Sequence, residues 1–166
     1  LFPKEVIGKG YPNLPGAHWL NVSKQNEFFH LMESRIKVCA DKGFLGVDAD
    51  NVDGWKRDTG FRITDQEEAR YIERLSATAH NQGLAFSLRN NLEQIDHLIG
   101  NIDMAIVEDC HGGEACKHWS TVLGDGKAVF VIEYSDESFA QCIVEHKRNA
   151  PETVAAILED FEANLL

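Results

Sequence analysis

Three carboxylates and one aromatic ring follow a short apolar segment of this chain, residues 44–47. The carboxylates are Asp48, Asp50 and Asp53, and the ring is that of Trp55. Carboxyl groups can give or take protons at a reacting atom, and an aromatic ring can stack on the apolar face of a sugar. The order of these residues predicts a buried strand that ends in an acidic loop.

Polar groups end three further apolar segments in the same way. In chain order these polar groups are Arg89 and Asn90 after residues 84–88, Glu108 and Asp109 after residues 104–107, and Glu133 and Tyr134 after residues 128–132. Reactive side chains at the carboxyl ends of successive strands are typical of a parallel β/α sheet. Tyr134, like Trp55, is a candidate for stacking on a sugar.

Asp50 and Glu108 are the candidate catalytic pair. Glycoside cleavage needs one protonated acid and one ionised carboxylate beside the anomeric carbon. The two residues end strands that have one strand between them, so their backbones start about 10 Å apart and the side chains can converge. The spacing fits a retaining or an inverting reaction, and either residue could be the acid. The alternative is that both are solvated loop residues.

A metal site is not expected, although residues 48–59 resemble a calcium-binding loop in composition. Asp53 and Gly54 come one place late for such a loop, and its twelfth position is Thr59, where calcium needs a bidentate glutamate. The histidines show no zinc-ligand spacing, and no glycine-rich phosphate loop is present. We therefore expect no metal and no cofactor, and keep a metal-dependent hydrolase as a lesser alternative.

The elements that must position these residues alternate along the chain. The predicted strands are residues 18–22, 44–47, 84–88, 104–107 and 128–132. Helices are predicted after Ser23, which would be an N-cap, and after the capping box at 64–67. Further helices are predicted at residues 92–99, at residues 116–122 and from Pro151 onwards. The first 17 residues are expected to be irregular, and the long loop at 50–63 is expected to shape a site.

This alternation predicts an α/β fold with a parallel sheet, as a single domain over residues 1–166. Five strands cannot close the eight-stranded barrel that the pattern most often builds. The sheet is therefore open, or about three βα units lie upstream of Leu1.

The composition narrows the possible partners. The chain has 27 acidic and 16 basic residues and a net charge of −11, which disfavours a nucleic-acid partner and favours a cationic ligand, although many soluble proteins are acidic. No apolar run approaches the roughly 20 residues of a membrane span, so no membrane partner is expected. The oligomeric state does not follow from the sequence. Cys110 and Cys116 flank a short loop, and either a disulfide or two free thiols would fit.

Several segments, in order, resemble glycoside hydrolase family 114. They are residues 46–55, 59–61, 79–84, 88–90, 107–110 with Cys116, and 126–134. The set spans roughly Trp19 to Cys142, and its order is specific although no single segment is. The members of that family are endo-α-1,4-polygalactosaminidases and relatives on a (β/α)8 barrel. The resemblance implies that this chain is a C-terminal portion of such a barrel, with about five parallel strands and the first βα units absent.

The resemblance also implies roles for individual residues. Asp50 matches the acid of the family's Asp-Asn-Val-Asp-Gly motif and Glu108 the glutamate of its Glu-Gln-Cys motif, which supports them as the catalytic pair. It implies a disulfide between Cys110 and Cys116 in a secreted protein. The residues predicted to contact substrate are Asp48, Asn51, Asp53, Trp55, Arg89, Asn90, Glu133 and Tyr134.

The function that this resemblance implies is cleavage of an α-1,4-linked galactosamine polysaccharide by two carboxylates. Such a polymer is cationic when partly deacetylated, so each ammonium group can meet a carboxylate. The chain departs from the family pattern at Ala49, where proline is usual, and at Gly112 and Gly113, where a Glu-Tyr pair is common. The substitutions at 112 and 113 leave the choice of substrate open. The alternative is a non-catalytic carbohydrate-binding protein.

Overall fold

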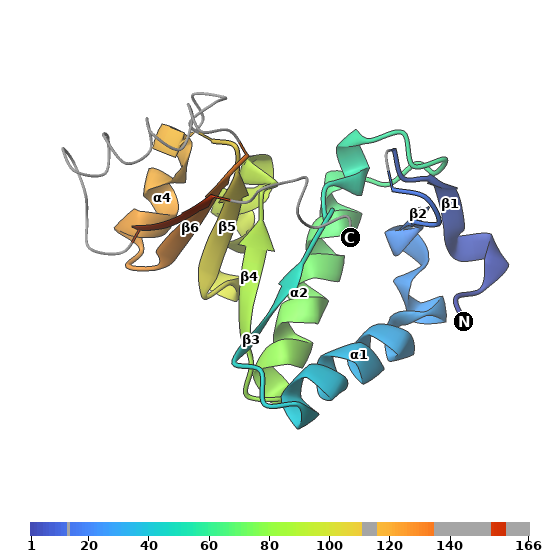
Figure 1. The fold of residues 1–166 in the computed structure, drawn as a ribbon. Helices are drawn as coiled ribbons and strands as arrows, with labels where there is room; N and C mark the ends of the chain where they lie inside the picture. Colours follow the sequence, from blue (N-terminus) through green and yellow to red (C-terminus); the bar gives the residue numbers. More distant parts are fainter. Residues whose placement is uncertain (13, 111–115, 135–153, 159–166) are drawn as a thin grey trace. The chain divides into compact units, whose positions relative to one another are not determined.

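The computed structural model of the protein describes residues 1–12, 14–110, 116–134 and 154–158 (Figure 1). The chain divides into two compact units, Leu1–Phe86 and Ser87–Leu166, and we describe each by itself. The glycines at 112 and 113, Cys142 and the end of the predicted last helix lie outside the described residues.

The first unit combines a small hairpin, two long helices and one further strand. Its elements in chain order are η1 (Lys4–Val6), β1 (Ile7–Gly10), β2 (His18–Leu20), η2 (Val22–Glu27), α1 (Phe29–Asp41), β3 (Gly46–Ala49), η3 (Gly54–Lys56) and α2 (Asp65–Asn81). The amide of Ala85 donates to the carbonyl of Leu45 at 2.9 Å, which places the start of the next strand, β4 (Ala85–Arg89), beside β3.

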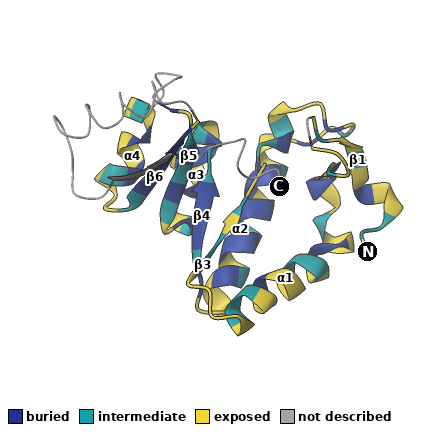
Figure 2. Ribbon diagram, in the orientation of Figure 1, coloured by how far each residue is buried: buried dark blue, intermediate teal, exposed yellow. Residues whose placement is uncertain are grey.

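Helix α2 begins at the predicted capping box. The Thr64 hydroxyl accepts from the Glu67 amide at 3.2 Å, and the Glu67 carboxylate accepts from the Thr64 amide at 2.8 Å. These two bonds satisfy donors that a helix start leaves open. Ile72, Leu75 and Ala79 lie at helical spacing and are buried, so α2 presents one apolar face to the core of the unit (Figure 2).

The first 17 residues are more regular than we predicted. β1 pairs with β2 in an antiparallel hairpin, so the strand at 18–20 belongs to this two-stranded sheet and the prediction that it joins the parallel sheet is wrong. Two of the four residues of β1 are glycines, which lowers its strand propensity and hid it in the sequence. Gly8 is needed because an added Cβ would lie 2.3 Å from the carbonyl oxygen of Thr59.

Helix α1 starts later than predicted. Ser23 lies within the 3-10 segment η2, where its hydroxyl donates to Asn21 Oδ1 at 2.6 Å, and α1 begins at Phe29. The local Ser23–Asn21 bond competes with capping, as short polar side chains often do. Phe29 then packs edge-on to Tyr71 of α2, with ring centroids 6.0 Å apart, and this contact joins the two helices.

The second unit is built on a parallel sheet in the order β4, β5, β6 and β7. Its other elements are η4 (Leu92–Gln94), α3 (Ile95–Leu98), η5 (Ile99–Asn101), β5 (Met104–Glu108), η6 (Cys116–Trp119), α4 (Ser120–Gly124), β6 (Ala128–Glu133) and β7 (Val154–Leu158). Arg89 is paired with Ile106, and Glu108 with Ile132, so the last residues of β4 and β5 reach the same edge. Buried residues run along these strands (Figure 2).

Residues 154–158 form a strand, and the predicted helix there is wrong. β7 pairs in parallel with β6, with Val154 opposite Val129 and Leu158 opposite Glu133. By periodicity alone, a short apolar run fits a strand and a buried helix equally well. Here the segment forms a strand because it pairs with β6, which is distant in the sequence. The other predicted strands lie within two residues of their predicted bounds, and the predicted α/β class with a parallel sheet is confirmed.

Among the residues described in the structure, we find no helix with the length and apolar character that crossing a membrane requires.

Candidate functional site

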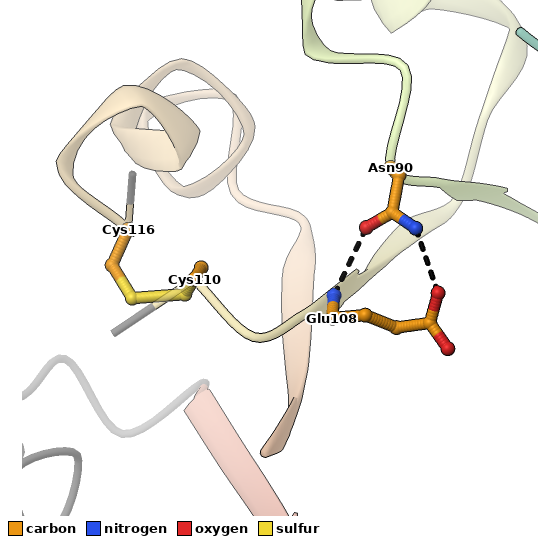
Figure 3. Close-up of a disulfide and its surroundings, with 4 residues drawn as sticks. All are labelled: Asn90, Glu108, Cys110 and Cys116. Atoms are coloured by element: carbon orange, nitrogen blue, oxygen red, sulfur yellow. Dashed lines mark hydrogen bonds between the residues drawn. A yellow bond between two sulfur atoms is a disulfide. The ribbon is translucent and has the colours of Figure 1, made fainter. Parts of the chain in front are cut away.

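Glu108, the last residue of β5, has a carboxylate that accepts hydrogen bonds from three side chains. Its Oε1 accepts from Arg89 Nη1 at 2.9 Å and from the Tyr134 hydroxyl, and its Oε2 accepts from Asn90 Nδ2 at 2.8 Å. The Glu108 amide donates in turn to Asn90 Oδ1 at 2.9 Å (Figure 3). Three predicted site residues thus meet around the carboxylate of a fourth, Glu108, whose side chain stays 24% exposed.

The surroundings of Glu108 favour its ionised form. Partial burial raises the pKa of this carboxyl, but the hydrogen bonds from Tyr134 and Asn90 and the charge of Arg89 outweigh burial and lower the pKa below its ordinary value. At neutral pH the group is therefore a carboxylate. Such a group can attack a carbon, stabilise a positive transition state or take a proton from water.

The backbone at the strand end brings Asn90 to Glu108. Asn90 has a left-handed conformation with φ of 52°, which asparagine tolerates better than most residues. Its amide donates to the carbonyl of Ile106 at 2.9 Å and continues the ladder between β4 and β5 past the strand end. The side chain is thereby held over β5, where it bonds both the backbone and the carboxylate of Glu108.

A disulfide between Cys110 and Cys116 lies just beyond Glu108 (Figure 3). The Cα atoms are 4.8 Å apart, and Cys110 is 2% exposed. The bond ties the end of β5 to the start of η6 and decides between the two states that the sequence left open. Cys110, Cys116 and Glu133 also bring metal-ligating atoms within 4.8 Å of one another, but the disulfide leaves no thiolate there to hold a metal.

Two further acids of this unit, Glu133 and Asp109, share a hydrogen bond. Glu133 is fully buried at the end of β6, and its predicted contact with substrate stays a prediction. Asp109 is exposed and left-handed, with φ of 52°. Burial, the charge of Glu133 and a hydrogen bond with that residue raise the pKa of Asp109. Asp109 therefore retains its proton more readily than an isolated aspartate does.

The first unit has a cavity of about 400 Å³ beside the end of β3. Three predicted residues line it, namely Asp48, Asp50 and Asn51. Asp50 is exposed, and its Oδ1 accepts from the Asn51 amide at 2.8 Å. Asn51 is left-handed, with φ of 55°, so the chain turns sharply just after Asp50.

Tyr11 and Trp19 are cavity residues that the sequence analysis did not assign to the site. The Tyr11 hydroxyl donates to Asn51 Oδ1 at 2.6 Å, and its ring packs on Trp19 with centroids 5.1 Å apart. Both residues line the cavity. Trp19 is 8% exposed, as expected for a core residue. The hairpin that holds these two rings had no clear strand signal, so nothing in the sequence connected them with Asp50.

Asp53 and Trp55, the remaining predicted residues of the acidic loop, do not line the cavity. Asp53 Oδ2 pairs with Arg57 Nη2 at 2.7 Å and lies 3.8 Å from Lys56 Nζ. The Trp55 amide donates to Glu68 Oε2 at 3.1 Å. Asp53 thus bonds within the loop and Trp55 bonds to α2, and the contacts of both residues with substrate stay predictions.

Glu68, on the first turn of α2, is a buried carboxyl that the sequence analysis missed. It is 2% exposed and lines the cavity. Burial, opposed by the hydrogen bond from the Trp55 amide and assisted by the charge of Asp53, raises its pKa to about 7. A signal was present in the sequence, because Glu68 precedes Ile72 and Leu75 at helical spacing and so shares their apolar face.

The two catalytic candidates belong to different units, Asp50 to the first and Glu108 to the second. Each is at or just beyond the carboxyl end of its strand, β3 for Asp50 and β5 for Glu108. That the two converge on one substrate stays a prediction.

Solved structures of other proteins resemble this chain. The crystal structure of Aspergillus fumigatus Ega3 in complex with galactosamine matches this chain with a TM-score of 0.83 and 25% identity, over 98% of this chain and 68% of that one. The glycoside hydrolase domain of PelA from Pseudomonas aeruginosa has the same fold, with a TM-score of 0.62 and 16% identity over 95% of this chain and 70% of that one. No curated protein sequence matches significantly.

The sequence profile of glycoside-hydrolase family GH114 matches residues 1–164, which is nearly the whole chain. The fold and the structural match to Ega3 agree with that profile. This protein therefore belongs to glycoside-hydrolase family GH114.

Proposed function

We propose that this protein cleaves α-1,4-linked galactosamine-containing polysaccharide by a two-carboxylate mechanism. The observation that carries the proposal is the ionised Glu108, which is held by Arg89, Asn90 and Tyr134 and is still partly exposed. Three donors fix the orientation of this carboxylate before any substrate arrives. Such preorganisation is the main contribution a protein makes to stabilising a developing charge.

The lowered pKa of Glu108 suggests how the two roles are divided. A carboxylate that stays ionised suits the nucleophile or base of glycoside cleavage, whereas the other residue must carry a proton to the leaving oxygen. We therefore assign the ionised role to Glu108 and the acid role to Asp50, which lines a cavity large enough for a sugar ring.

An amino-sugar polymer is the substrate class that the charges favour. The chain carries a net charge of −11, so a cationic polymer is attracted to it as a whole. The related Ega3 was crystallised with galactosamine. The disulfide suits an oxidising compartment, and it supports our proposal that the protein is secreted.

The test is hydrolysis of partly deacetylated galactosamine polymer, followed as new reducing ends. We expect activity in the wild type and a loss of at least about a thousandfold in Glu108→Gln and Asp50→Asn. Arg57→Gln, which alters the acidic loop outside the cavity, is the matched control and should retain most activity. Circular dichroism checks that every variant is folded. Wild-type rates in either carboxylate variant would reject the assignment, and retention of polymer without cleavage would favour the non-catalytic carbohydrate-binding alternative.

A further inference from the structure

Glu68 holds the turn that follows the acidic loop. Its Oε2 accepts from the Trp55 amide at 3.1 Å. The bond crosses from the first turn of α2 to η3, whose residues come directly after the loop of Asp50 and Asp53. A capped helix of 17 residues is thereby connected to the segment that carries the proposed acid.

Gly54 lies close to this carboxyl. A Cβ added at Gly54 would lie 3.1 Å from Glu68 Oε2, 3.4 Å from the Thr59 methyl group and 3.6 Å from the Trp19 ring. A side chain at position 54 would therefore press on the Glu68 carboxyl. A change in the position or charge of Glu68 acts on the backbone at 54–55 through the hydrogen bond to the Trp55 amide and through this close contact.

Several ionisable groups face the Glu68 carboxyl. Asp53 lies in the loop, Tyr71 is one turn further along α2, and Arg35 of α1 acts on Tyr71. Burial and Asp53 raise the pKa of Glu68 to about 7, against the Trp55 amide. The carboxyl thus gains or loses a proton near neutral pH, and the bond to the Trp55 amide is stronger when the carboxyl is charged.

We propose that Glu68 is a positioning residue for the acidic loop at 50–55, acting through the amide of Trp55 and the close turn at Gly54. Its effect on catalysis rests on the proposed function, because the loop carries Asp50. Its effect on the loop does not depend on any activity. The two can therefore be measured separately.

The first measurement is the chemical shift of the Trp55 amide in the full chain, followed by NMR from about pH 5 to about pH 9. We expect a titration with a midpoint near 7 in the wild type, and none in Glu68→Gln, which keeps an oxygen acceptor but cannot ionise. Glu67→Gln is the matched control, because it changes the neighbouring carboxyl, keeps the capping box and should titrate like the wild type. A flat wild-type curve, or an unchanged midpoint in Glu68→Gln, would overturn the proposal.

A second variant keeps the test independent of how well Glu68→Gln folds. Gly54→Ala leaves Glu68 in place but pushes on its Oε2, so we expect a smaller titration amplitude and faster exchange of the Trp55 amide. Unchanged amplitude and exchange would contradict the proposed path.

The catalytic readout uses the galactosamine polymer. Removing the acceptor in Glu68→Ala should lower kcat about tenfold with KM nearly unchanged, whereas Glu68→Gln should restore most of kcat and lose the titration near pH 7 from its pH profile. Glu108→Gln should lose hydrolysis and still show the Trp55 titration, which separates a failure of the proposed function from a failure of this one. Equal losses in Glu68→Ala and Glu68→Gln with an unchanged pH profile would reject the positioning role.

Discussion

Glu108 is ionised because of its neighbours, and Arg89 is the positively charged residue among them. Arg89→Met should raise the pKa of Glu108, because burial would then be opposed by hydrogen bonds alone. Since the proposed reaction needs ionised Glu108, the acidic limb of the kcat/KM profile should move to higher pH. Arg89→Lys keeps the charge and should move the limb less. The measurement is polymer hydrolysis across pH, and an unmoved limb in Arg89→Met would exclude the arginine from this role.

The raised pKa of Glu68 predicts that the stability of the folded chain depends on pH. Its pKa is about 7 in the folded chain against an ordinary value of 4.5, so the folded state holds this proton more tightly than the unfolded state. Stability from this group is therefore present below pH 4.5 and is lost as the pH rises to 7, by about 3 kcal/mol at most. Glu68→Gln should gain stability over the wild type at pH 8 but not at pH 4.5, in urea unfolding monitored by circular dichroism. Equal differences at both pH values would contradict this linkage.

The strand ends are the elements that organise the site, and the disulfide after β5 is the feature most open to test. It closes a short loop with a sequence separation of six residues, so its loss should cost about 2 kcal/mol of unfolding free energy. The double variant Cys110→Ser and Cys116→Ser should show this loss in urea unfolding. Cys39→Ser, which removes the free cysteine of the first unit, is the control and should change stability little. Equal stability of the double variant and the wild type would show that the bond does not stabilise the chain.

At the scale of the whole molecule, net charge governs the approach of the polymer. A chain of charge −11 should retain partly deacetylated galactosamine polymer strongly at low salt and weakly at high salt. A fully N-acetylated polymer has no ammonium groups and should show little salt dependence. Affinity electrophoresis with Glu108→Gln, which should not cleave, measures both. The same salt dependence for the two polymers would mean that ammonium groups do not guide binding.

Sequence patterns predicted local features well. The box at Thr64 and Glu67 marked the start of α2, and apolar runs located β3 to β6, because capping and strand burial depend on nearby residues. Sequence patterns failed to predict elements whose formation depends on residues far away in the chain. β1 pairs with β2 and also passes close to Thr59, which is distant from it in the sequence, and β7 pairs with β6, which is distant as well.

The sequence by itself determined which residues stand at the strand ends, since runs of apolar residues followed by acids and amides are local patterns. It also carried enough of the family's segments to identify the family. Only the tertiary structure decided that Arg89, Asn90 and Tyr134 meet on Glu108, and that Glu68 is buried against the Trp55 amide. Those contacts join residues far apart in the chain, and the charge of a carboxyl is set by its neighbours in space and its burial.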